Sequence, residues 1–217
     1  MQLSSQMLGF RAEVTIVAIL ETTEDISQET KQNLEASLRG LVTFEDQRIT
    51  HLRSTEPPSW LKVFADVAEW ISPLKVIATV FFSQLAKNAA DDLWKNKARI
   101  AVLLRETAAL PLRKFAEALS EAKRGSQANT DIVVGLPIPD DHFGTALIVP
   151  TETIEDAAAA LAVFVCHAEE IDATVRAAIE GGEGPASSVR ILLRPNGQVL
   201  LRWQHQKTLE IVEHEFE

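Results

Sequence analysis

Apolar residues at the start of the chain form first a continuous run and then a helical spacing. The run EVTIVAIL, residues 13–20, is short and rich in β-branched side chains, which is typical of a strand buried on both faces. Apolar residues then recur at helical spacing up to Gly40, after a start that Asp25 or Ser27 can cap. Two further stretches, LVTFE and RITHLR, alternate like strands. This region therefore predicts a β-α-β segment over residues 1–56.

The most apolar run of the chain, SWLKVFADVAEWISPLKVIATVFFSQL, covers residues 59–85 and predicts two helices or one kinked helix. Two prolines break the preceding pattern and Ser59 is a good N-cap, while a Ser-Pro pair inside the run repeats this signal. Lys62, Asp66 and Glu69 follow helical spacing and form one narrow polar stripe. Such helices are apolar on more sides than a single core contact covers.

Three interpretations of this run stay open: central helices of the core, a docking face for a partner, and amphipathic helices 59–86 that insert into a membrane. Charged residues interrupt the run too often for a membrane span, which needs about 20 predominantly apolar residues. Its large aromatic residues, with one just beyond it, decide between core and docking face. The candidate partner-binding residues are Trp60, Trp70, Phe81, Phe82 and Trp94.

The remaining pattern predicts two more helices and several strands. An amphipathic helix is expected over residues 110–125, within a helical block at 57–125. Strands DIVVGLPIP and TALIVP flank a turn at 140–144, and a long Ala-rich helix follows at 153–180. The last segment, 126–217, ends in further strands.

The stretch SVRILLRPNGQVLLRW predicts a hairpin, and its register follows from the matching of apolar faces. A three-residue loop at 195–197 opposes Ile191 to Leu201 and Leu193 to Val199, whereas a two-residue loop would oppose Ile191 to an arginine. We expect the first register. The element order then predicts an α+β protein with a mixed β-sheet, comprising a β-α-β start, a helical insertion and a C-terminal β-β-α-β-β part.

The expected register also sets two arginines opposite each other. Arg190 faces Arg202, with Arg194 nearby, and like charges in such positions destabilise a ladder unless an acidic group compensates them. The tail TLEIVEHEFE carries four glutamates and alternates like a third strand. The rival interpretation is that the three arginines bind an anion or acidic group of a partner.

Composition and charge narrow the classes of protein. With 46% hydrophobic and 24% charged residues the chain folds, and its net charge of -10 disfavours nucleic acid as a partner. Residues 95–124 run against this average, since eight basic and three acidic residues give +5. We interpret this segment as a solvated face that the acidic remainder of the chain complements, with an acidic partner, an anionic membrane or nucleic acid as the alternative contact.

No catalytic, metal-binding or cofactor-binding motif occurs, so we expect no cofactor and no metal. Weak catalytic candidates are Asp140, Asp141 and His142, which share one turn. The single cysteine, Cys166, cannot form an internal disulfide, and no secretory signal pattern opens the chain, which favours the cytoplasm.

The sequence favours a non-enzymatic cytoplasmic protein that binds another protein, or a second copy of itself, as a regulatory or assembly subunit. Two alternatives remain. One is a membrane-acting effector that inserts helices 59–86, and the other is a hydrolase built on the Asp-Asp-His turn.

Overall fold

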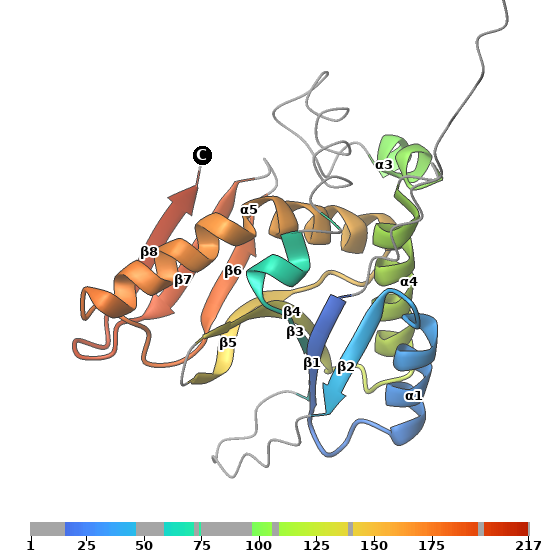
Figure 1. Cartoon of the computed structure of the whole chain (residues 1–217), viewed down its shortest axis with the longest axis horizontal. Coiled ribbons are helices and arrows are strands. Elements are labelled where there is room, and N and C mark those ends of the chain that lie inside the picture. The colour runs from blue at the N-terminus through green and yellow to red at the C-terminus, as the bar shows by residue number, and fades with distance from the viewer. Residues whose placement is uncertain are drawn as a thin grey trace, which may run out of the picture.

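A computed structural model describes residues 16–46, 59–71, 74, 97–105, 109–138, 141–194 and 198–216. Eight strands form one sheet in the order β2-β1-β3-β4-β5-β6-β7-β8 (Figure 1). The strands are β1 (Ile16–Thr22), β2 (Val42–Asp46), β3 (Trp60–Phe64), β4 (Asp131–Ile138), β5 (Asp141–Ile148), β6 (Val189–Leu193), β7 (Val199–Gln204) and β8 (Ile211–Phe216). The helices include α1 (Gln28–Ser37), α3 (Lys97–Leu103), α4 (Leu110–Arg124) and α5 (Ile154–Glu180).

The sheet is mixed, which confirms the α+β class. Strands β1 and β2, β3 and β4, and β5 and β6 pair in parallel, and the other neighbours pair antiparallel. The β-α-β start is β1-α1-β2, and the β-β-α-β-β part is β4-β5-α5-β6-β7. In Figure 1, α5 extends from its contact with α4 to the end of the molecule where β7 and β8 lie.

The prediction of a helix from Ser59 onward was wrong, because Trp60–Phe64 forms strand β3 in the middle of the sheet. Its side chains are mostly buried on both faces of the sheet, so the run shows no strand alternation, and the helical spacing of Lys62 with later polar residues was coincidental. Ser59 caps no helix but accepts a hydrogen bond from Thr130 Oγ1 at 3.0 Å. Helix begins only at residues 67–71.

The expected turn at 140–144 also needs correction. The backbone from Asp141 onward already belongs to β5, and Asp141 pairs with Ile138 of β4. A left-handed glycine, Gly144 with φ of 65°, lies within this strand.

The hairpin register is confirmed. Ile191 lies opposite Leu201, Leu193 opposite Val199, and Arg190 opposite Arg202. The loop at 195–197 lies outside the described residues. The tail also forms the expected third strand, since β8 pairs antiparallel with β7.

Two helix ends follow the predicted capping residues, Ser27 of α1 and Gly125 of α4. Ser27 caps α1, because its Oγ accepts the Thr30 N–H at 3.1 Å. Thr153 caps α5 by accepting the Asp156 N–H at 3.1 Å, and Gly125 ends α4. Both later helices therefore lie where the apolar spacing predicted them. None of the helices in the part of the chain that the structure describes is long and apolar enough to cross a membrane.

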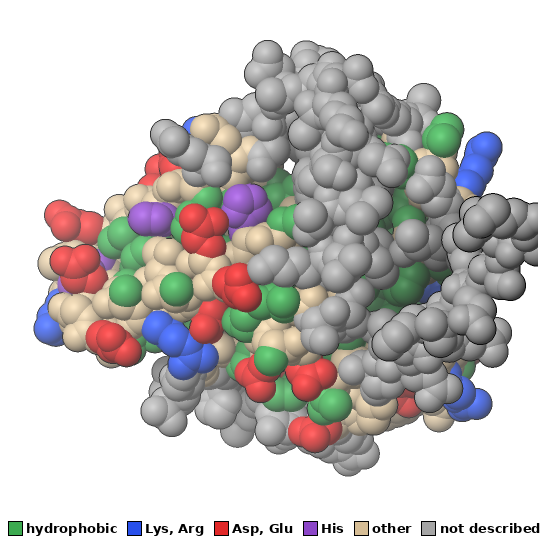
Figure 2. Space-filling view, turned by 45° about the horizontal axis from the view of Figure 1, so that its top comes forward, with side chains coloured by type: hydrophobic (Ala, Val, Ile, Leu, Met, Phe, Trp, Pro, Cys, Tyr) green, Lys and Arg blue, Asp and Glu red, His purple; other side chains and the backbone are tan. Residues whose placement is uncertain are grey.

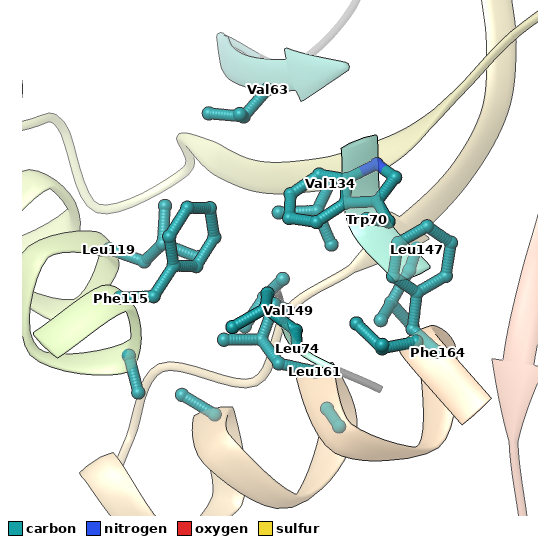
Figure 3. Packing of buried hydrophobic residues seen from close by; sticks show 14 of the residues in the cluster. Val63, Trp70, Leu74, Phe115, Leu119, Val134, Leu147, Val149, Leu161 and Phe164 are labelled. Atoms are coloured by element: carbon teal, nitrogen blue, oxygen red, sulfur yellow. The ribbon is translucent and has the colours of Figure 1, made fainter. Parts of the chain in front are cut away.

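One face of the sheet packs with the helices in a single hydrophobic core (Figure 3). Trp70 lies fully buried at its centre, edge-on to Phe115 at 5.5 Å and to Phe164 at 5.6 Å between ring centroids. Its indole Nε1 donates to the Gly135 carbonyl at 3.1 Å. Nine-tenths or more of every residue from 156 to 165 in α5 is buried, because its small alanines allow close packing on all sides. The core therefore holds Trp70, one of the candidate partner-binding residues.

Candidate binding site on the outer face of the sheet

The face of the sheet opposite this core, here called the outer face, carries an apolar row that crosses four strands. Leu200 of β7 lies opposite Leu192 of β6, and Ile148 of β5 lies opposite Val133 of β4. Ala146 and Arg190 are in register one pleat earlier, so Leu192 and Ile148 are neighbours across β5 and β6. Val133 and Leu200 are buried, whereas Ile148 is 48% and Leu192 38% exposed. The middle of the row is thus open.

Charged residues stand at both ends of this row. At one end Glu215 of β8 lies opposite Leu200. At the other end Lys62 of β3 pairs with Val133, and its Nζ lies 3.9 Å from Glu21 Oε2. The Lys62 ammonium also lies 4.3 Å from the ring centroid of Trp60, within cation–π range. The half-buried Trp60 therefore helps to hold a buried ion pair.

A crevice opens in the middle of the row because β5 and β6 diverge. Their parallel ladder ends where Leu147 pairs with Ile191. Beyond that point β5 stays bound to β4, since Val149 N–H donates to the Ile132 carbonyl at 2.8 Å. The end of β6 stays beside β7, because the Arg194 N–H donates to the carbonyl of Gln198, just before β7, at 2.9 Å. Each strand follows its outer neighbour, which leaves a gap between them.

This gap, here called the β5–β6 crevice, has a volume of about 460 Å³. That volume falls within the roughly 300–1,000 Å³ common for ligand pockets. The first turn of α5 contributes one carboxylate, and strands β5 and β6 with the segment after β5 contribute the rest. The lining residues are Ala146, Leu147, Ile148, Pro150, Asp156, Arg190, Ile191, Leu192 and Leu193.

The two charged residues of the crevice differ in their bonding. Asp156 is buried, and its Oδ2 accepts a hydrogen bond from the Thr153 hydroxyl at 2.7 Å as part of the α5 cap. Arg190 is exposed, and no residue that the structure describes forms an ion pair with it. The crevice thus combines an apolar lining with one arginine that is available to a ligand.

The acidic tail compensates the other two arginines. Arg194 Nη2 lies 2.5 Å from Glu215 Oε1, and Arg202 Nε lies 3.4 Å from Glu213 Oε1. Glu213 and Arg202 are also direct partners in the β7–β8 ladder. The expectation that the tail brings carboxylates to the arginines is therefore confirmed for two of the three.

The remaining sequence candidates are placed as follows. Phe81, Phe82, Trp94 and Asp140 lie outside the described residues. Asp141 and His142 contribute backbone to β5. Among the described residues no group of three or more His, Cys, Asp or Glu side chains is arranged to hold a metal ion.

Sequence reasoning missed Ile148 and Leu192 as site residues. For Leu192 a signal was present, since the strand RILLR places this leucine on the same face as two arginines. For Ile148 no local signal exists, because its exposure depends on the divergence of two strands far apart in the sequence.

Comparison of the chain with models of protein families, with curated proteins and with solved structures finds no match. The fold and the outer face therefore supply the evidence on function.

Proposed function

We propose that this protein is a non-enzymatic regulatory or assembly subunit that docks a segment of a partner protein on the outer face of its sheet. The observation that carries the proposal is the exposure of Ile148 and Leu192. Both lie on inner strands of an eight-stranded sheet, where an apolar side chain is usually covered. A partner that covers them removes apolar area from water, which stabilises the complex.

The layout of the outer face supports this proposal. Stable protein interfaces have an apolar centre, where a few anchor side chains fill pockets, and a polar rim. Here the β5–β6 crevice lies at the centre of the apolar row, while Glu215 and the Lys62–Glu21 pair flank it. An apolar side chain of the partner fits the crevice as such an anchor.

The net charge of the chain favours one class of partner, and its single cysteine favours one cell compartment. Acidic side chains are spread over the left and lower parts of the face in Figure 2 and outnumber the basic ones there, in keeping with the net charge of -10. Such a surface repels phosphate backbones, so a protein partner is favoured over nucleic acid. Cys166 as the lone cysteine fits a reducing compartment, and we place the protein in the cytoplasm.

Site-specific photo-crosslinking tests the proposal. A benzophenone amino acid replaces Leu192 in one variant and Ile179 of α5, which is 40% exposed, in a matched control. In an extract of the source cells, the Leu192 variant should give a discrete crosslinked product that the Ile179 variant lacks. Binding of the identified partner should then fall at least about tenfold in Leu192→Asp and stay unchanged in Ile179→Asp. Equal crosslinking at both positions would argue against docking on the outer face.

A further inference from the structure

We infer that the β5–β6 crevice binds a small amphiphilic carboxylate, that is, an apolar chain with one carboxylate head group. This inference goes beyond docking of a protein, because the crevice and Arg190 form a ligand site that needs no partner protein to be complete. It rests on the shape and lining of the cavity and on charge complementarity at Arg190.

The lining of the crevice suits an apolar chain. Seven of its nine lining residues have apolar side chains. Ile148 and Leu192 form its exposed walls, and the buried Leu147 and Ile191 close the side toward the core. Burying a methylene against such walls contributes about 0.8 kcal/mol, so an apolar chain of several carbons gains enough to bind.

Arg190 supplies the position for the head group. It lines the crevice, is exposed, and lies on the outer face beside Ala146. A guanidinium binds a carboxylate through two parallel hydrogen bonds, and no described residue already occupies this one. Its neighbour Arg202 adds positive charge, although Glu213 partly offsets it.

The other charged lining residue does not favour a cationic head group. Asp156 accepts from the Thr153 hydroxyl and lies in the first turn of α5, where the helix dipole already stabilises its negative charge. The hydrogen bond from Thr153 therefore belongs to the helix cap. The head-group preference of the crevice is consequently set by Arg190 and is anionic.

A bound amphiphile would cover Ile148 and Leu192. If the partner docks there as proposed above, the ligand and the partner compete for these residues. This competition rests on the proposed function. Binding of the ligand does not depend on the partner, so it is tested on the protein by itself.

The test follows the methyl resonances of Ile148, Leu192 and Ile179 by NMR while decanoate, decan-1-ol or decyltrimethylammonium is added below micelle-forming concentrations. Decanoate should shift Ile148 and Leu192 in a saturable manner and leave Ile179 unchanged. Decan-1-ol should bind at the same methyl groups about tenfold more weakly, and the cation more weakly still, because neither pairs with Arg190.

Two variants separate the head group from the chain. Arg190→Gln should weaken decanoate binding about tenfold without changing decan-1-ol binding, whereas Arg176→Gln, which removes a surface arginine of α5, should change neither. Leu192→Trp, which fills the crevice, should weaken both ligands. Decanoate and decan-1-ol of equal affinity, or an Arg190→Gln variant that binds like the native protein, would overturn the carboxylate assignment. Unshifted Ile148 and Leu192 methyl groups would overturn the site itself.

Discussion

The two faces of the sheet differ most sharply at β5 and β6, where adjacent residues have opposite surroundings. Leu147 and Ile191 are buried in the core, whereas the next residues along the same strands, Ile148 and Leu192, are 48% and 38% exposed. The side chains are equally apolar on both faces. The apolar residues that face the core stabilise the fold. The fold does not explain why the apolar residues on the outer face are exposed.

The outer face itself varies from strand to strand. At β3 and β4 it is closed, since Phe64, Lys62 and Val133 are buried there. Gly135 makes this possible, because a Cβ at that position would lie 2.6 Å from the Phe64 ring. At β5 and β6 Ile148 and Leu192 stay exposed among the described residues, and the crevice opens. Substitutions in the core, in the closed part of the outer face and at its edge should therefore differ in their effects on stability.

The two tryptophans on opposite sides of the sheet should respond very differently to truncation. Trp70→Ala removes a fully buried side chain with two edge-on aromatic partners and should lower the free energy of unfolding by about 3–5 kcal/mol. Trp60→Ala removes a half-buried ring over Lys62 and should cost about 1–2 kcal/mol. Urea unfolding followed by circular dichroism measures both. Similar losses in the two variants would contradict the division between core and outer face.

Adding one methyl group at Gly135 should destabilise the closed part of the outer face. The new Cβ would lie 1.9 Å from the Thr145 carbonyl oxygen as well as against Phe64, so the backbone or the ring must move. We expect Gly135→Ala to cost about 1–3 kcal/mol, the range for an overpacked site. Gly125→Ala is the control, since its nearest contact is a side-chain oxygen of Thr30 at 3.1 Å, and it should cost less. Thermal melts of both variants provide the comparison.

Local patterns predicted much of this fold because the physics that sets them is local. The caps and apolar spacing located α4 and α5, and face matching fixed the β6–β7 register and the approach of the tail to Arg194 and Arg202. Strand β3 was missed because burial on both faces erases alternation. The crevice was missed because it arises where β5 and β6 separate, and they are joined only through the 27 residues of α5 and its connections. No short stretch of sequence includes both strands, so no local pattern could predict their separation.

Charge reversal at Glu213 should weaken β8 pairing on the outer face. Glu213→Arg would set three arginines side by side across β6, β7 and β8, in a row with Arg190 and Arg202. The expected loss of stability is up to about 1 kcal/mol at low salt, and it should shrink at high salt because these side chains are exposed. The matched control, Glu210→Arg, makes the same change in net charge in the β7–β8 connection. A loss that is equal in both variants would mean that net charge, and not the row, is responsible.

The smallest effect should come from Asp25, far from the crevice. Hydrogen bonds from the Ser59 and Thr23 hydroxyls hold the pKa of this exposed carboxyl below its usual range. Its contribution to stability is therefore complete above the pKa of the unfolded chain and is lost as pH falls through the lower folded value. Asp25→Asn should cost less than about 1 kcal/mol at neutral pH, and the difference from the native protein should vanish in acid. A difference that persists unchanged at acidic pH would show that the charge is not its cause.

Leu147→Asp and Ile148→Asp separate the core face from the outer face, since the two residues are adjacent on one strand and face opposite sides. Leu147→Asp buries an unpaired charge in the core and should abolish the cooperative unfolding transition. Ile148→Asp should keep that transition within about 1 kcal/mol of the native protein and lose binding on the outer face. If Ile148→Asp unfolds the protein as Leu147→Asp does, Ile148 is part of the core and not of a binding site on the outer face.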